Sequence, residues 1–385
     1  MEHIGIDLGA RHSHVMVISE AGEPTLQRRV KTEDLPAWLE GRPASRVVVE
    51  ACTQSPAIAR ASLAAGHQAK IIPGTLVRAL GVGARGIKTD ERDAEVLARA
   101  SVRIEDLPSV HIRSEASRRR REVIAARSLL VESRRSIALS VKSWLRGRLV
   151  TLPGRANSPA FCESVRRAAE AHEEGLPLAT EILLSNFEQL CMQIDKLDEA
   201  IEEVIEQDEV CQRLMKIPGV GPQVSLAFTT HIDDPARFAN ADHLGSYLAL
   251  VPGEATTGGK VKRTSTIKAG PAYLKALLVQ ASWSMWRARP NDPMVVWARR
   301  IADRRGKRIA IIALSRKLAT VMWAMWKSGS RYDPTLTSIA RAGEPSTAAQ
   351  VAAFIVAAIP QTDTADDSPK TARTTSRRQT GNPVD

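Results

Sequence analysis

Two apolar segments near the start of the chain each end in an acidic residue, and this pattern constrains the fold more than any other feature of the sequence. Asp7 ends the first segment, which begins at His3, and Glu50 follows three consecutive valines. Short apolar runs bounded by turn residues predict strands that are buried in a sheet. The sequence therefore predicts two carboxylates at places where buried strands end.

A second acidic pair opens a predicted helix. Asp90 and Asp93 stand three residues apart in the segment 88–94 (KTDERDA), ahead of a run rich in alanine, valine and leucine. Side chains at this spacing share one face of a helix, so both carboxylates can point at one site. Taken singly, each acid is explained as a cap or a solvated side chain. Together, Asp7, Glu50, Asp90 and Asp93 make a candidate site for a divalent metal ion.

Residues 1–100 combine strand and helix patterns. The predicted strands cover residues 3–9, 15–19, 25–30, 46–50 and 69–72, and the predicted helices cover 35–39 and 56–65. The first three strands form a meander, and the later strands alternate with helices. This order predicts a mixed sheet covered by helices.

The segment Gly5-Ile6-Asp7-Leu8-Gly9 has two interpretations. A similar strand and turn holds a nucleotide phosphate in actin-like and sugar-kinase ATPases, whereas ribonuclease-H-like nucleases use the first-strand aspartate to bind catalytic metal. The ATPase interpretation needs a second Asp-Gly-Gly phosphate loop, which the sequence does not contain. The nuclease interpretation needs a glutamate at a later strand end and an aspartate on a helix, and both are present. It is favoured, with an actin-like ATPase as the remote alternative.

The chain is basic, with 54 lysine and arginine residues against 43 acids, a net charge of +11 and a pI near 9.8. This excess favours a polyanionic partner, nucleic acid first and an anionic membrane second. The four cysteines include no Cys-x-x-Cys pair and indicate neither a zinc ribbon nor a disulfide framework. Because no signal sequence and no apolar run of about 18 residues is found, we expect a cytoplasmic protein that does not bind a membrane.

Residues 105–150 predict a long basic helix. Ten basic residues and two acids fall between Arg118 and Arg148. A solvated face is the ordinary explanation for such a run, but the bias in sign favours contact with a phosphate backbone. Such contacts give an affinity that depends on salt and not on nucleotide sequence. The residues predicted to make them are Arg118, Arg119, Arg120, Arg121, Arg134 and Arg135.

Residues 178–214 predict one long helix whose apolar positions step by threes and fours. This pattern is typical of a coiled-coil or helical-hairpin arm, which we expect to join protomers in a homo-oligomer. The segment Ile217-Pro218-Gly219-Val220-Gly221 follows and resembles a helix-hairpin-helix turn, whose backbone amides hold a DNA phosphate at a helix N-terminus. The alternative is a tight turn that needs glycine only for its dihedral angles.

Residues 256–270 combine hydroxyl groups, glycines and cations. The segment Thr256-Thr257-Gly258-Gly259 is predicted to be a flexible loop, and a hydroxyl-rich stretch that includes Ser265 follows it. This composition suits a nucleophile or a phosphate clamp, and a mobile basic loop is the alternative. The cations predicted to bind nucleic acid in this region are Lys260, Lys262, Arg263 and Lys268.

Helices are predicted on both sides of this loop. Residues 238–250 form the first, and residues 271–326 form the others, with their tryptophans in the core and not on a base-stacking surface. Residues 336–385 drift to alanine, threonine, serine and proline and are predicted to be disordered.

Taken in order, these motifs resemble a known family. They are the strand ends at Asp7 and Glu50, the segment 88–94, the turn 217–221, the segment 247–252 (YLALVP), and Ile267-Lys268 with Gly270. Each motif is weak alone, but the ordered set resembles the DEDD transposases of the insertion-sequence one-ten family, also called bridge-RNA-guided recombinases. The resemblance covers nearly all of residues 1–335.

The resemblance implies an α/β domain followed by all-α regions. Residues 1–104 are expected to form a ribonuclease-H-like domain, similar to Holliday-junction resolvases, that carries the DEDD acids. Residues 105–213 are expected to form the basic helix and the coiled-coil arm. Residues 214–335 are expected to form a mostly helical C-terminal transposase domain, followed by the disordered tail.

The resemblance also implies a chemistry. Asp7, Glu50, Asp90 and Asp93 correspond to a tetrad that holds one or two Mg²⁺ ions, with Mn²⁺ as the alternative. In the family a serine of the C-terminal domain attacks DNA and forms a covalent link, and a noncoding bridge RNA pairs with donor and target DNA. Protomers assemble as a dimer or tetramer. The implied function is a recombinase that mobilises an insertion sequence.

The sequence departs from the family pattern at the nucleophile. The family serine precedes a glycine, and Thr257 occupies that position here, with Ser265 as a second candidate. Threonine keeps the hydroxyl, but its extra methyl restricts the side chain and crowds an in-line approach. Lys275 replaces an arginine of the pattern and loses bidentate contact with phosphate. A catalytically impaired nucleic-acid-binding member is therefore the alternative function.

Overall fold

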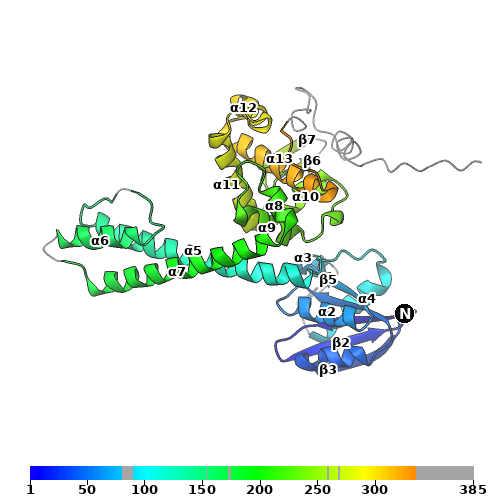
Figure 1. Cartoon of the computed structure of the whole chain (residues 1–385). Coiled ribbons are helices and arrows are strands. Elements are labelled where there is room, and N and C mark those ends of the chain that lie inside the picture. The colour runs from blue at the N-terminus through cyan, green and yellow to red at the C-terminus, as the bar shows by residue number, and fades with distance from the viewer. Residues whose placement is uncertain (80–89, 153, 172–174, 258–259, 268, 335–385) are drawn as a thin grey trace, which may run out of the picture. The chain divides into compact units, whose positions relative to one another are not determined.

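The computed structural model describes residues 1–79, 90–152, 154–171, 175–257, 260–267 and 269–334 (Figure 1). The chain divides into two compact units, Met1–Leu197 and Asp198–Asp385, and helix α7 (Leu178–Glu206) runs from the first into the second. The tail that the sequence predicts to be disordered lies outside the described residues.

A five-stranded mixed sheet opens the first unit. Its strands are β1 (Glu2–Asp7), β2 (His12–Ile18), β3 (Pro24–Lys31), β4 (Ser45–Glu50) and β5 (Gln68–Ile72). They lie in the order β3-β2-β1-β4-β5; the β1–β2 and β2–β3 pairs are antiparallel, and the β1–β4 and β4–β5 pairs are parallel. This arrangement confirms the predicted mixed sheet that begins as a meander.

Helices cover both faces of this sheet. On one face α1 (Leu35–Glu40), which follows the short helix η1 (Thr32–Asp34), and α2 (Ser55–Ala64) pack on the side chains of Ile4 and Ile6. On the other face α4 (Asp90–Arg103) packs on Met16 and Val48, and α3 (Gly74–Ala79) contributes Val77. Burial on both sides explains the apolar runs in the middle of these two strands, Ile4–Ile6 in β1 and Val47–Val49 in β4.

The rest of the first unit is helical. Helix α5 (Glu115–Arg146), α6 (Ala160–Glu170) and the first part of α7 share a core that includes Val141, Val165 and Phe187. Arg166 of α6 ties the cluster by ion pairs to Glu181 and Glu188 of α7 at 2.7 and 2.6 Å. The long basic helix predicted over residues 105–150 is confirmed from Glu115 to Arg146, and its first ten predicted residues are not helical. Helix α6, which follows the prolines at residues 153 and 159, was not predicted.

The second unit contains the remaining helices and a two-stranded hairpin. After the end of α7 come α8 (Glu209–Leu214), α9 (Pro222–Ile232), the short helix η3 (Pro235–Arg237), α10 (Ala241–Tyr247), β6 (Pro252–Thr257), β7 (Lys260–Thr266), α11 (Ala272–Ala288), α12 (Pro293–Arg305) and α13 (Lys307–Ser328). Helix α13 is long and apolar enough to cross a bilayer, but 56% of its apolar window is buried inside the structure. It is therefore placed as the core helix of this unit.

Three sequence predictions need correction here. The helix predicted for residues 178–214 is interrupted after Glu206, because the Asp208 side chain accepts a hydrogen bond from the Cys211 amide at 2.9 Å and starts α8. The helix predicted to begin at Phe238 begins at Ala241, because the Asn240 side chain caps it. The predicted loop around Thr257 is part of the hairpin.

The tryptophans are only partly a core feature. Trp323 is fully buried and donates a hydrogen bond from Nε1 to the Pro235 carbonyl at 2.8 Å. The tryptophans at 283, 286, 297 and 326 are half-buried. Arg299 lies over the Trp286 ring at 5.4 Å, and Lys317 lies over the Trp297 ring at 4.7 Å.

Candidate active site and nucleic-acid interface

Asp7 and Glu50 lie side by side at one edge of the sheet. The parallel register pairs Ile6 with Val49, so the next residues on β1 and β4 are these two acids. Strands in a sheet are about 4.8 Å apart, and alternate residues share a face. Gly5 and Val48 both face α4, so the acids two residues further on are placed on that same face.

Helix α4 runs antiparallel to β1 and brings its first turn toward Asp7. Near the start of β1, His3 Nδ1 lies 2.8 Å from Ser101 Oγ, and two residues further on Gly5 lies against the backbone of Ala94 and Ala98. Two strand residues advance about 6.6 Å and four helix residues about 6 Å. The same step therefore places Asp7 beside the helix turn that begins at Asp90.

Gly5 makes this close approach possible. A Cβ atom at residue 5 would lie 2.1 Å from the Ala94 carbonyl oxygen and 2.5 Å from the Ala98 amide nitrogen. Both atoms belong to the α4 backbone, which no rotation of a side chain can move aside. The glycine is therefore a packing requirement of the α4–β1 contact, in addition to its place in the first-strand motif.

The two helix acids differ in exposure. Asp93 is buried, at 3% exposed, whereas Asp90 is exposed at the start of α4, directly after residues 80–89, which lie outside the described residues. Lys88 and Thr89 of the predicted motif fall in that range. The segment is thus described only from Asp90 onward.

Gly74 lies close to the Glu50 carboxylate. A Cβ atom at Gly74, the first residue of α3, would lie 2.8 Å from Glu50 Oε1. The glycine leaves room for the carboxylate at the carboxyl end of β4. Any larger residue at position 74 would push Glu50 or α3 away.

The four predicted acids have the chemistry that a hard divalent cation requires. Four carboxylates offer the oxygen ligands that Mg²⁺ prefers, and the backbone places Asp7, Glu50 and the first turn of α4 at one edge of the sheet. The side chains themselves are not drawn together. Among the residues that the structure describes, no group of three or more His, Cys, Asp or Glu side chains is close enough to hold a metal ion.

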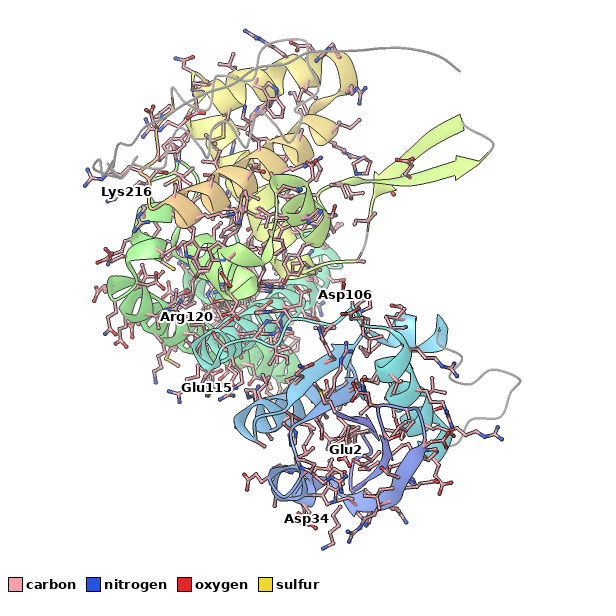
Figure 2. All side chains as sticks on the ribbon, turned by 90° about the vertical axis from the view of Figure 1, so that its right-hand side faces the viewer. Glu2, Asp34, Asp106, Glu115, Arg120 and Lys216 are labelled. Carbon is pink, nitrogen blue, oxygen red and sulfur yellow. The ribbon has the colours of Figure 1, made fainter. Side chains whose placement is uncertain are left out.

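Thr257 is the last residue of β6, at the turn end of the hairpin. It pairs with Lys260, the first residue of β7, and the two residues between them lie outside the described residues. In Figure 2 this yellow-green hairpin extends away from the helices of the second unit. The sequence signal for it was present, because β-branched residues flank a Gly-Gly pair, a pattern that predicts a hairpin.

The base of the hairpin joins two of the predicted motifs. Gly270 adopts a φ of +152°, and a Cβ atom there would lie 2.8 Å from the Tyr247 carbonyl and 2.9 Å from Ala249 Cβ. The Ile267 amide donates to the Val251 carbonyl at 3.2 Å. The YLALVP segment and the Ile267–Gly270 segment therefore form one packed anchor beneath β6 and β7.

Lys275 belongs to this anchor. From the first turn of α11 its Nζ donates to Thr266 Oγ1 at 3.0 Å and to the Ile267 carbonyl at 3.3 Å. Partial burial lowers the pKa of its ammonium group. The sequence pattern predicts only a weakened phosphate ligand at this position, whereas the contacts of Lys275 hold the end of β7 against α11.

The structure places only some of the cations that were predicted to bind nucleic acid in this region. Lys260, Lys262 and Arg263 lie on β7, and Lys268 lies outside the described residues. Ser265 is exposed near the base of the hairpin, far along β7 from the turn that follows Thr257.

The helix-hairpin-helix-like turn connects α8 to α9. Gly219 has a φ of +85°, and a Cβ atom there would lie 2.5 Å from the Ala281 carbonyl of α11. The neighbouring hollow, about 430 Å³, is lined by Asp198 and Glu202, and Gln223 at the start of α9 donates to Asp198 at 3.2 Å. Acids beside this helix N-terminus oppose phosphate binding, and packing alone accounts for Gly219.

The arginines predicted to bind nucleic acid on α5 are engaged with neighbours. Arg118 forms ion pairs with Glu115 and Glu122, and Arg119 pairs with Glu115 at 3.2 Å. These arginines lower the pKa of Glu115 to about 2. Arg120, labelled with Glu115 in Figure 2, and Arg121 also have partners.

Further along α5, Arg135 pairs with Glu132 at 3.5 Å, and Arg134 donates to the Asn157 carbonyl at 3.0 Å. Over its whole length α5 still carries nine basic residues against three acids. The excess of positive charge on this helix therefore survives the local pairing.

Comparison with known proteins identifies the class. Residues 211–294 match the family described as transposase IS116/IS110/IS902, and residues 4–148 match the DEDD transposase family of IS110. A transposase for insertion sequence element IS1328 of Yersinia enterocolitica is 28% identical over 336 residues, which cover 85% of this chain and 97% of that protein. A probable family 20 transposase of Pseudomonas aeruginosa is 26% identical, with 87% and 99% covered.

A transposase for insertion sequence element IS1111A of Coxiella burnetii is 25% identical, covering 84% of this chain and 88% of that protein. The architecture and these relatives define an insertion-sequence transposase, a DNA-recombining enzyme. The chain belongs to the IS110 family of DEDD transposases. The family that the sequence motifs predicted is thereby confirmed.

Proposed function

We propose that this transposase mobilises its insertion sequence by metal-dependent cleavage and exchange of DNA strands through a covalent protein–DNA intermediate. The observation that carries the proposal is the placement of Asp7, Glu50 and the first turn of α4 at one edge of a sheet. Carboxylates together with substrate phosphates are the usual ligands of Mg²⁺ in phosphoryl transfer. The same placement supports a ribonuclease-H-like fold for residues 1–104.

Asp7, Glu50, Asp90 and Asp93 would hold the metal. When bound, Mg²⁺ supplies positive charge to a phosphate group and stabilises the oxygen that leaves it. Asp93, buried against the sheet, is fixed by its helix, whereas Asp90 is exposed and free of core packing. Closure of the four carboxylates around the ion is therefore expected to accompany metal and DNA binding.

Thr257 would be the nucleophile. Its hydroxyl loses a proton and forms a bond from Oγ to the scissile phosphorus, while the bond from phosphorus to a deoxyribose oxygen breaks and that oxygen gains a proton. One phosphodiester is exchanged for another, so the step needs no energy source and can reverse during strand exchange. The position of Thr257 at the turn end of a projecting hairpin supports this role.

Partners and site choice complete the proposal. We expect element ends and target DNA to be the substrates, a noncoding bridge RNA to select the site, and a dimer or tetramer of the chain to act in the cytoplasm. The exposed apolar side chains Leu129 and Leu139 of α5 and Ile182 and Met192 of α7 support an assembly through these helices.

The second candidate function is a nucleic-acid-binding member that has lost strand transfer. The observation that favours it is the threonine at the nucleophile position, whose methyl group crowds an in-line attack. The two functions share the same binding surfaces and differ only in the covalent step.

One experiment separates them. Purified protein is mixed with element-junction DNA, the noncoding RNA and Mg²⁺, and covalent adducts are resolved on a denaturing gel and mapped by mass spectrometry. A DNA-linked peptide that contains Thr257 supports the recombinase, and a link at Ser265 moves the nucleophile. An adduct that forms only in Thr257→Ser supports the impaired member. Asp93→Asn is expected to abolish the adduct and leave DNA binding intact; adduct formation by that variant contradicts the metal assignment.

A further inference from the structure

A cluster of exposed positive charge without carboxylate partners among the described residues lies outside α5. It lies where α12 ends and α13 begins, on the two sides of Gly306. Within residues 293–310 the only acid is Asp303. The cluster, called here the α12–α13 corner, consists of the exposed residues Arg299, Arg300, Arg304, Arg305, Lys307 and Arg308.

These cations lack the partners that the α5 arginines have. Among the described residues none of the six forms an ion pair with a carboxylate, and Arg304 donates only a long hydrogen bond to the Arg300 carbonyl at 3.4 Å. Arg299 lies over the Trp286 ring, which is a contact with an aromatic ring and not with a carboxylate. Like charges packed this densely repel one another, so the folded chain gains nothing from them by themselves.

The helix ends do not explain the whole corner. Arg304 and Arg305 stand in the last turn of α12, where the helix dipole favours cations. Lys307 and Arg308 stand in the first turn of α13, where the dipole opposes them and no acid compensates. A structural purpose therefore accounts for only part of the cluster, and the remainder indicates an anionic partner.

The chemistry of the corner fits a duplex backbone better than a single strand. Single strands are held by aromatic rings on which bases stack. In the described residues of this corner, Trp286 is half-buried beneath Arg299 and Trp297 is half-buried beneath Lys317. The surface thus offers charge without a free stacking platform. Both family matches end before it, at residues 148 and 294.

We propose that the α12–α13 corner is a binding surface for the phosphate backbone of duplex DNA. The proposal rests on the proposed function only in taking DNA as the partner. Each arginine or lysine that neutralises a phosphate releases a condensed counterion, so the affinity carries a salt dependence that counts the contacts. Such a surface would hold DNA without regard to its sequence.

The test is a salt titration of DNA binding with matched variants of the full chain. Fluorescence anisotropy gives the dissociation constant for a labelled duplex of arbitrary sequence, without metal, over a series of KCl concentrations. The patch variant is R300Q/R304Q/R308Q. The charge-conserving variant is R300K/R304K/R308K. The matched control R28Q/R29Q/R167Q removes the same number of charges from exposed arginines of the first unit.

The slope of log K against log salt is negative, and losing three phosphate contacts is expected to reduce its magnitude by about 2.7 in the patch variant. The charge-conserving variant and the matched control are expected to keep the wild-type slope. An unchanged slope in the patch variant overturns the proposal, and so does an equal fall in the matched control. A loss seen with duplex RNA and not with duplex DNA overturns the assignment of the partner.

The salt slope of DNA binding is independent of catalysis, because it is measured without metal and without cleavage. Asp93→Asn is expected to show the wild-type slope. If the patch variant keeps the wild-type slope and still forms the covalent adduct, the α12–α13 corner does not bind DNA and the proposed function is unaffected. A patch variant with the reduced slope supports the corner even where no adduct forms.

Discussion

Replacing Gly5 by alanine tests how closely α4 must approach β1. The new methyl group would lie 2.1 Å from the Ala94 carbonyl oxygen, whereas ordinary contacts of a Cβ atom begin at 3.4 Å. The helix must therefore retreat by more than an ångström. A gap of about 0.5–1 Å already forfeits a quarter to a half of the dispersion energy of each contact. Leu97 and Ala98, buried residues of α4 itself, would share that loss.

We expect Gly5→Ala to lower the free energy of unfolding by about 3 kcal/mol, the upper end of the usual range for overpacking, because the obstacle is backbone. With a urea m-value of about 2 kcal/mol per molar, the midpoint falls by about 1.5 M. The assay is urea unfolding followed by circular dichroism. DNA cleavage should fall as well, since α4 carries Asp90 and Asp93.

Gly41→Ala is the matched control in the same unit. Gly41 has a φ of −79°, and a Cβ atom there would meet nothing closer than the Trp38 carbonyl at 3.7 Å. Its effect is expected to stay within about 1 kcal/mol. Equal midpoints for Gly5→Ala and the wild type would refute the close α4–β1 contact, and with it the placement of the helix acids beside Asp7.

Three further predictions concern pH, the hairpin anchor and the basic helix. Burial, helped by the nearby positive charge of Arg46, lowers the pKa of His3 below 6.5, so the unfolded chain binds more protons and stability falls as pH drops below 6.5. His3→Gln should flatten that fall in urea midpoints, and an unchanged pH slope would contradict it. Lys275→Met should lower the free energy of unfolding by about 1–3 kcal/mol and reduce adduct formation. Lys275→Arg should restore both. Full adduct yield in the methionine variant would show that Lys275 does not position the hairpin for catalysis. Charge reversal at residues 118–121 should weaken nucleic-acid binding and reduce its salt slope; an unchanged slope would leave α5 as a solvated face.

Much of the first unit was readable from local patterns. The apolar runs that end in Asp7 and Glu50 predicted β1 and β4, and the turns between them predicted the meander. These predictions succeeded because burial on both faces leaves a continuous apolar run in the middle of each strand. The helix patterns of α5, α11 and α13 were equally strong, since each has many turns over which its periodicity accumulates.

Short elements set by caps and turns were the ones that failed. The break before α8 depends on one side chain, Asp208, and the start of α10 depends on Asn240. The sequence around Thr257 predicts a loop where the structure has a hairpin, because its glycines outweigh the β-branched residues on either side. A single cap contributes about 1 kcal/mol, which is too little to dominate a sequence pattern and enough to end a helix.

The sequence by itself determined the family and the mixed sheet, and it predicted four acids as the metal site, because these inferences depend on residue types and on spacing along the chain. Only the tertiary structure decided where the acids stand relative to one another. The register of β1 against β4 and the antiparallel course of α4 over Gly5 are contacts between distant segments. The tertiary structure also decided which cations are available to a partner. Arginines of α5 form ion pairs with acids of their own helix, whereas, within the described residues, those of the α12–α13 corner do not. Charge along a sequence is fixed by composition, but its availability to a partner depends on which neighbours the fold supplies.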